Sequence, residues 1–329
     1  MGTGQGLPGA ADKDASVRTD LAIEQLLARE DGGRGVAGVD VDVEHHDGVE
    51  ICRVHVTDTQ GESAVGKPVG HYVTLDAPAL LDRDTEAQEA TARLLAAELG
   101  RLLGLTDEAK LLVVGLGNWN ATPDALGPKV VGQLLVTRHL QGHVPPDLAG
   151  NLRSLAAIAP GVLGITGIET GEIIRGVVDR IHPDAVIAVD ALASRSVERI
   201  LRTIQIADTG IHPGSGVGHH RAEIDSKFLG VPVIAVGVPT VVHAATIAAD
   251  TIDLLAEHLA GQPAQAGIAK LAREERQQLI AQVLQSAVGD LMVTPKQIDA
   301  LVDDMAKVLA AGINAAIHPK VAAQELLLG

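Results

Sequence analysis

The stretch Leu111-Leu-Val-Val-Gly-Leu-Gly-Asn-Trp-Asn-Ala-Thr-Pro-Asp-Ala-Leu-Gly-Pro128 decides the fold that we predict for this chain. Its first four residues are apolar and predict a short buried strand. Gly115 and Gly117 follow, and glycine lets the backbone turn tightly because it has no Cβ. Gly127-Pro128 then opens a helix, with proline in the first turn. Such strand–turn–helix units are where α/β proteins place their chemistry, so the acidic residue in this turn, Asp124, is the first candidate for a functional role.

A strand–loop–helix rhythm continues from this stretch toward the C-terminus. Further strands are predicted at residues 156–159, 185–189, 203–207 and 231–236. Helices are predicted at residues 128–140, 169–181, 196–201 and 240–259, with two more at 268–288 and 295–311. Alternation of this kind predicts a mostly parallel sheet with helices on both faces. We therefore expect a three-layer α/β/α fold.

The residues before the quoted stretch predict an antiparallel extension of this sheet. Valines alternate with acidic residues over 39–44, Asp47-Gly48 is typical of a hairpin turn, and residues 49–56 return as a second strand. Residues 72–75 predict a third strand and residues 84–103 a helix rich in Ala, Leu and Glu. Residues 1–16 are rich in glycine and polar residues, without periodicity.

The composition restricts the class of protein. The chain has 329 residues with 26 basic and 42 acidic side chains, a net charge of −16, which argues against broad binding to nucleic acid or to anionic membranes. A single cysteine, Cys52, excludes an intrachain disulfide framework and fits a reducing cytosol. The sequence contains neither a leader with an apolar core nor a long uninterrupted apolar run, so we expect a soluble, intracellular protein.

Three aspartates are predicted at the carboxyl ends of strands, where doubly wound sheets bind their ligands. Asp124 follows the first strand of the alternating region, Asp190 ends an apolar run, and Asp208 ends the run Thr203–Ala207. When two desolvated carboxyls lie close together, the pKa of one rises and the pKa of the other falls, so that one can act as an acid and the other as a base. Alternatively, each aspartate caps the helix that follows its strand. That alternative is stronger for Asp208, because Asp-Thr-Gly is also a simple turn.

The glycine-rich segment from His212 to His220 suggests two other chemistries. Ser215 beside histidine would suggest a serine hydrolase, but the nucleophile elbow requires glycine where this chain has Pro213. The histidines of this segment have no zinc-motif spacing. A dinucleotide site at Gly115 is also weakly supported, since Asn120 occupies the position of the third glycine. We therefore interpret His212–His220 as a flexible loop beside the site.

These motifs together resemble the germination protease family, the endopeptidases that degrade small acid-soluble spore proteins. The resemblance covers nearly the whole chain, and its motifs are long and unusual. The matching stretches are Ser16-Val-Arg-Thr-Asp-Leu-Ala22, Gly115-Leu-Gly-Asn118, Thr122-Pro-Asp-Ala-Leu-Gly-Pro128, Pro160-Gly-Val162, Thr166-Gly-Ile-Glu-Thr170, Ala188-Val-Asp-Ala-Leu-Ala193, Arg195-Ser196, Thr203–Gly218, Ile234-Ala-Val-Gly-Val-Pro-Thr-Val-Val242 and Leu291-Met-Val-Thr-Pro-Lys296.

The resemblance implies an aspartic-type endopeptidase with Asp124 and Asp190 as its catalytic pair. It implies a zymogen that removes residues 1–20 by cleavage between Asp20 and Leu21, since members cut after an acidic residue followed by a large apolar residue and Ala. One α/β peptidase domain over residues 21–329 would remain, with a phosphorylase/hydrolase-like sheet as in hydrogenase maturation endopeptidases. The loops lining the site would contain Gly115, Gly117, Asn118, Asp208, His212 and Ser215.

The same resemblance implies a homotetramer in the cytoplasm of the forespore and spore core. Its substrates would be small acid-soluble spore proteins, with no metal or cofactor, no direct nucleic-acid binding and no membrane. Two rivals stay open. The Gly-Leu-Gly-Asn turn with its aspartate also resembles metal-dependent hydrogenase maturation endopeptidases, whose chains are about half as long. A non-enzymatic protein-binding module, with unused carboxylates at the strand ends, is the other.

Overall fold

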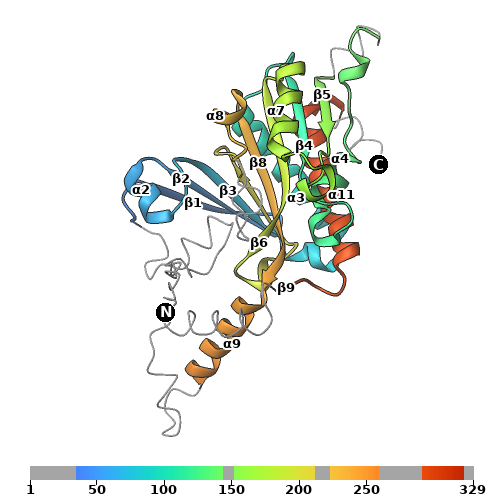
Figure 1. Cartoon of the computed structure of the whole chain (residues 1–329). Coiled ribbons are helices and arrows are strands. Elements are labelled where there is room, and N and C mark those ends of the chain that lie inside the picture. Colours follow the sequence, from blue (N-terminus) through green and yellow to red (C-terminus); the bar gives the residue numbers. More distant parts are fainter. Residues whose placement is uncertain (1–34, 144–151, 212–222, 259–290, 322–329) are drawn as a thin grey trace, which may run out of the picture.

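The computed structural model describes residues 35–143, 152–211, 223–258 and 291–321 (Figure 1). One mixed sheet runs through them in the order β1-β2-β3-β7-β8-β6-β4-β5, and β9 pairs with β8. The strands are β1 (Val39–His46), β2 (Val49–Val56), β3 (Gly70–Asp76), β4 (Lys110–Gly115), β5 (Ser154–Ile158), β6 (Ala185–Ser194), β7 (Thr203–Ala207), β8 (Val233–His243) and β9 (Met292–Val293).

The sheet divides into a parallel half and an antiparallel half. Strands β5, β4, β6 and β8 are parallel neighbours, whereas β1, β2, β3 and β7 pair antiparallel and reach β8 through β7. The predicted N-terminal hairpin is therefore confirmed as an extension of the sheet. Its turn uses Asp47 and Gly48, both at positive φ, as type I′ hairpin turns require.

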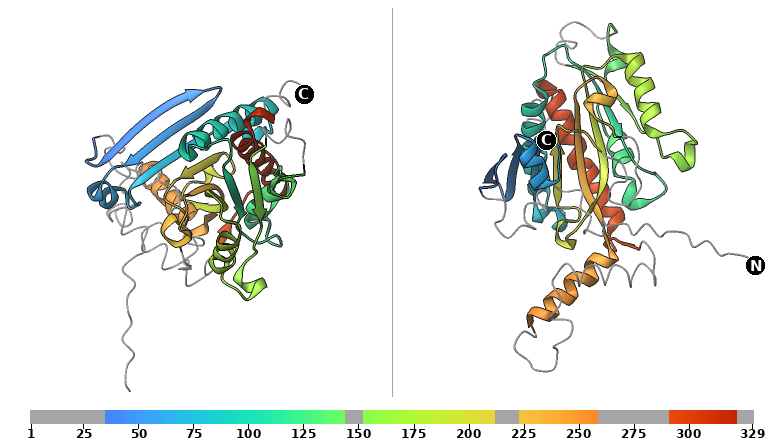
Figure 2. Two further views of the ribbon diagram at one scale, coloured as in Figure 1. Left: turned by 90° about the horizontal axis from the view of Figure 1, so that it is seen from above. Right: turned by 60° about the vertical axis from the view of Figure 1, so that its left-hand side comes forward.

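Helices cover both faces, which confirms the predicted three-layer α/β fold (Figure 2). On one face lie α3 (Thr85–Leu103), α4 (Leu126–Val131) and α11 (Ile298–Ile317), and on the other α2 (Thr59–Val65), α7 (Thr170–Ile181) and α8 (Ser226–Leu229). The short helices are α6 (Leu163–Thr166), η1 (Pro78–Asp82), η2 (Thr122–Asp124), η3 (Arg138–Leu140) and η4 (Val197–Arg199). Helix α9 (Ala244–His258) extends away from the end of β8 (Figure 1).

Strand β4 shows why a continuous apolar run forms the centre of this fold. Successive side chains of a strand point to opposite faces. Leu111 and Val113 pack into the core beneath α3 and α11, while Leu112 and Val114 pack into the core beneath α7. A strand segment buried on both faces must be apolar at every position, as β4 is from Leu111 to Val114, after the exposed Lys110.

Several predicted boundaries were wrong. The helix predicted at 128–140 ends at Val131, because Gly132 follows as its C-cap, and only η3 is helical after it. Strand β6 continues past Val189 to Ser194 by pairing with β8, so Asp190 lies within the strand instead of ending it. Of the region predicted helical at 196–201, only η4 forms. The helix predicted at 268–288 lies outside the described residues.

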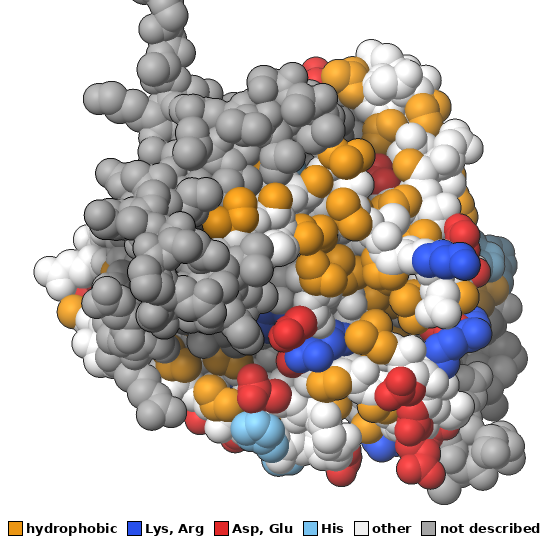
Figure 3. Space-filling model, turned by 90° about the horizontal axis from the view of Figure 1, so that it is seen from below, with side chains coloured by type: hydrophobic (Ala, Val, Ile, Leu, Met, Phe, Trp, Pro, Cys, Tyr) orange, Lys and Arg blue, Asp and Glu red, His pale blue; other side chains and the backbone are white. Residues whose placement is uncertain are grey.

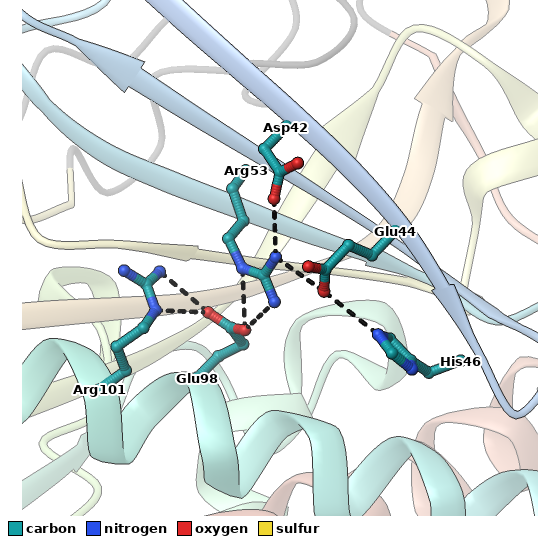
Figure 4. Close-up of polar contacts among 6 residues, drawn as sticks. All are labelled: Asp42, Glu44, His46, Arg53, Glu98 and Arg101. Atoms are coloured by element: carbon teal, nitrogen blue, oxygen red, sulfur yellow. Dashed lines mark hydrogen bonds and ion pairs between the residues drawn. The ribbon is translucent and has the colours of Figure 1, made fainter.

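An ion-pair network fastens the N-terminal hairpin to helix α3 (Figure 4). Arg53 of β2 donates two hydrogen bonds to Glu98 Oε1, from Nε (3.0 Å) and Nη2 (2.6 Å), and also contacts Asp42 and Glu44 of β1. Arg101 donates two hydrogen bonds to the other carboxylate oxygen of Glu98, Oε2, from Nε (3.0 Å) and Nη2 (2.9 Å). Burial of Glu98 acts to raise its pKa, but Arg53 and Arg101 outweigh burial and lower the pKa.

This network predicts a pH-dependent contribution to stability. Because the folded pKa of Glu98 is lowered, its contribution is complete above the unfolded pKa of about 4.3 and disappears as the pH falls through the folded value. We expect Glu98→Gln to lower the free energy of unfolding by about 1.5–3 kcal/mol at pH 7. Urea unfolding of both proteins at pH 7 and pH 3 measures this difference, which should shrink at pH 3.

The matched control is Glu89→Gln on the same helix. Glu89 is exposed and pairs only loosely with Arg93, at 3.8 Å, so its replacement should change stability by less than about 0.5 kcal/mol. An equal loss for Glu98→Gln at both pH values would show that the side chain matters for packing alone.

Candidate active site at the carboxyl ends of the parallel strands

The turn after β4 lies directly against β6. The last residue of β4, Gly115, pairs with Val189, and the N–H of Leu116 donates to the Val189 carbonyl at 2.8 Å. A Cβ on Gly127 would lie 2.7 Å from that carbonyl and 2.3 Å from the Leu116 carbonyl. Gly127 therefore allows the start of α4 to pack against both backbones at the point where β4 ends.

The turn that follows holds the carboxylate of Asp124. The N–H of Asn118 donates both to the Asp124 main-chain carbonyl (3.1 Å) and to its Oδ2 (2.9 Å). Helix α11 also fixes this turn, because Thr122 Oγ1 donates to Asp299 at 2.9 Å. The η2 turn lies beside β6 and β8. Asp124 is thus held half-buried at the carboxyl end of the parallel strands.

Asp190 lies beside the same turn. It is the residue of β6 directly after Val189, and therefore the first residue beyond the end of β4. Its side chain is 7% exposed, and its Oδ1 accepts the N–H of Ala191 at 2.9 Å. Alternation along β6 places it on the face of the sheet that carries α7, since Val189 packs on the opposite face. The structure therefore places Asp124 in the connection after β4, and Asp190 on the neighbouring strand β6, one residue beyond the end of β4.

Asp208 lies elsewhere, which differs from the expectation that it lines this edge. Strand β7 is antiparallel to β8, and Gln205 is in register with Gly237, which is in register with Asp190. Three further residues along β7 take Asp208 about 10 Å toward the opposite edge. There its carboxylate binds the main-chain N–H (2.8 Å) and the Nδ1 (2.7 Å) of His71.

Four of the predicted site residues lie outside the described part of the chain. Gly115, Gly117 and Asn118 do form the turn that holds Asp124. The loop residues His212 and Ser215 and the cleavage-site residues Asp20 and Leu21 lie outside the described residues.

Two residues near the pair had no indication in the sequence. Gln205 is buried and points to the same face of the sheet as Asp190. The two residues are in register across Gly237 of β8, and the side chain of Leu192 packs over that glycine. Asp299 holds Thr122 from a helix 177 positions away. Strand register and helix docking brought these residues to the site, and neither leaves a local sequence motif.

The described residues offer carboxylates at this edge instead of an activated thiol. Cys52 is buried, and burial raises its pKa to about 11, so its thiol is protonated at neutral pH. Within residues 35–143, 152–211, 223–258 and 291–321, no group of three or more His, Cys, Asp or Glu side chains is placed to hold a metal ion. None of the helices described is long and apolar enough to cross a membrane.

Comparisons with known proteins cover almost the entire chain. A family model described as germination protease matches residues 16–267 and 262–327. A germination protease of Caldanaerobacter subterraneus subsp. tengcongensis is 50% identical over 316 residues, which covers 94% of this chain and 97% of the relative. One from Clostridium acetobutylicum is 48% identical over 320 residues, covering 94% and 98%. Among solved structures, the [NiFe] hydrogenase maturation protease HycI from Thermococcus kodakarensis matches with a TM-score of 0.27 and 20% identity, over 44% of this chain and 80% of that chain.

Proposed function

The chain belongs to the germination protease family, and from this membership we propose that it is an aspartic-type endopeptidase that degrades small acid-soluble spore proteins. The family itself supports a spore germination endopeptidase. The observation that carries the finer proposal is the placement of Asp124 within the turn after β4 and of Asp190 on strand β6 beside that turn. Two carboxyls so placed suit the sharing of one proton across a water molecule.

The proposed reaction uses one ionised and one protonated carboxyl. The ionised group takes a proton from the water while the water oxygen bonds to the carbon of the scissile carbonyl. The protonated group donates to the carbonyl oxygen, where negative charge develops. When the tetrahedral intermediate collapses, the C–N bond breaks and the amine nitrogen leaves with a proton from the pair. Each carboxyl accepts one backbone N–H, Asp124 from Asn118 and Asp190 from Ala191, and either can take the ionised role in this scheme.

Self-processing is the second part of the proposal. The sequence Asp20-Leu21-Ala22 has an acidic residue, a large apolar residue and alanine, the pattern that the family resemblance implies for substrates. Cleavage after Asp20 would convert a zymogen into a chain beginning at Leu21. We further propose that the enzyme acts as a homotetramer in the forespore and spore core, where its unfolded substrates are released.

Intact mass spectrometry of the purified full chain tests the proposal. The wild type is incubated at mildly acidic pH beside Asp124→Asn, and each is then given a peptide spanning residues 16–24. Loss of residues 1–20, or cleavage of the peptide after Asp20, in the wild type alone supports an Asp124-dependent endopeptidase. Equal cleavage by both proteins would place the reaction in another group, and no cleavage of either substrate by the wild type or by a chain beginning at Leu21 would reject the proposed specificity.

A further inference from the structure

Exposed apolar side chains gather at the edge of the sheet that holds Asp124 and Asp190. Trp119 is 55% exposed in the turn after β4, and Leu163, Ile165 and Ile168 are 38–58% exposed in the segment after β5. Figure 3 views this end of the molecule from below. In the part of this view that is not grey, hydrophobic side chains gather at the centre and toward the upper right, whereas most of the charged side chains lie in the lower half.

The topology places these apolar residues next to the carboxylates. Strand β4 has β6 on one side and β5 on the other, all three parallel, so their C-terminal connections lie side by side. Asp190 lies on β6, and Trp119 and Asp124 lie within the connection from β4. The apolar segment, Leu163 to Ile168, follows β5. This segment leads into α7, which covers the face of the sheet that Asp190 occupies.

Hydrogen bonds of the neighbouring residues fix the backbone position of Trp119. Its neighbour Asn118 donates its N–H to Asp124 Oδ2 and accepts, at its own Oδ1, the N–H of Asn120 at 2.9 Å. The indole is thus attached to a turn with hydrogen bonds on both sides, yet it stays half-exposed. Large aromatic side chains normally bury most of their surface, so an exposed one on a fixed turn beside reacting groups indicates a contact with a ligand.

We propose that Trp119, with Leu163, Ile165 and Ile168, forms the subsite for a large aliphatic side chain next to the scissile bond of an extended peptide. This inference rests on the proposed function. A peptide segment is the expected occupant because the apolar side chains and the two carboxyls lie at the carboxyl ends of three neighbouring parallel strands. An extended chain laid across that edge would present its scissile carbonyl to the carboxylates and the adjacent side chain to the apolar surface.

Trp119 is the one tryptophan of the chain, so its fluorescence reports directly on this surface. The wild-type protein is titrated with a peptide of residues 16–24 whose Asp–Leu amide is replaced by an uncleavable methyleneamine link. The same peptide with Gln in place of Leu21 serves as the control ligand. We expect a saturable change in tryptophan emission for the leucine peptide, and at least about tenfold weaker binding of the glutamine peptide.

Selectivity of cleavage provides the second readout. For cleavable peptides, the wild type should prefer Leu over Gln after the acidic residue by about 10–200-fold in kcat/KM. Trp119→Gln and Ile165→Gln should each reduce this ratio several-fold, through a lower kcat/KM for the leucine peptide. The control is Val43→Gln on strand β1, where the valine is 50% exposed but remote from the carboxylates, and it should leave the ratio unchanged. Circular dichroism confirms that the variants fold.

The outcomes separate this inference from the proposed function. If the wild type cleaves and prefers leucine, but Trp119→Gln and Ile165→Gln keep the full preference, the subsite lies elsewhere and the inference is wrong. If tryptophan emission changes with protein concentration and not with peptide, a second copy of the chain covers this surface and the inference is likewise wrong. If the wild type cleaves no peptide while the emission still responds selectively to the leucine peptide, the proposed activity fails and the binding surface stands.

Discussion

Replacing either Asp124 or Asp190 by Asn is expected to reduce the rate of peptide cleavage by at least about 1,000-fold. Asparagine preserves the size of the side chain and can still accept the Asn118 and Ala191 N–H bonds, but it can neither take a proton from water nor donate an acidic one. If the two carboxyls act as one unit, the double variant should be hardly slower than either single variant.

The control for this prediction is Asp208→Asn. Asp208 also follows an apolar strand, but it binds His71 toward the opposite edge of the sheet. Its replacement should leave kcat within a few-fold of the wild type. Initial rates on a fluorogenic peptide are measured for the wild type and all four variants at equal concentration. Comparable loss in Asp208→Asn and Asp190→Asn, or multiplicative losses in the double variant, would contradict a catalytic pair at the β4 turn.

Replacing Gly117 by Ala is expected to abolish most activity by displacing the turn that carries Asp124. Gly117 has φ of +113°, a conformation that side-chain-bearing residues rarely adopt, and a Cβ there would lie 2.0 Å from the Asp124 carbonyl oxygen. The backbone strain alone costs about 1–3 kcal/mol. Movement of this carbonyl also moves the hydrogen bonds from Asn118, so we expect at least about a 100-fold lower kcat.

Gly176→Ala in helix α7 is the matched control. Nothing lies within 4 Å of a Cβ at that position, so alanine should be neutral or stabilising by about 0.5–1 kcal/mol. Thermal unfolding reports stability, and peptide cleavage reports kcat for both variants. A Gly117→Ala protein with wild-type kcat would show that the turn tolerates rearrangement and that the position of Asp124 matters little.

The sequence was sufficient to place Asp124 and Asp190 at the carboxyl ends of neighbouring parallel strands, but it misplaced Asp208. Asp124 and Asp190 follow apolar stretches in parallel strands, so the rule that carboxyl ends share an edge applied to them. It failed for Asp208 because β7 runs antiparallel to β8. Only residues 195–202 connect β6 to β7, and a parallel crossover needs a dozen residues or more. The strand predicted at 185–189 left residues 190–202 for the connection, long enough for a parallel crossover, so the direction of β7 became evident only from the extension of β6 to Ser194.

Other errors arose where tertiary contacts override local preference. Residues 128–140 have helix-forming composition, yet the helix ends at Val131, and the residues after it bond instead to α11 and β5. The Leu135 N–H, for example, donates to Asn314 Oδ1 at 2.9 Å, and Thr137 bonds to the backbone of Leu155. Such partners lie far away in the sequence, and their positions follow from the packed fold alone.

The outer strand β1 has a consequence for how copies of this chain behave in crowded solution. A strand at the margin of a sheet offers unpaired N–H and C=O groups to any other extended chain, which invites fibrous aggregation. Along β1, Asp40, Asp42 and Glu44 alternate with valines; Arg53 of β2 pairs with Asp42 and Glu44, and Asp40 lies opposite His55. A second β1 laid against the first would bring like charges together. The acidic side chains of β1 that pair with Arg53 therefore also disfavour edge-to-edge association of two copies of this sheet.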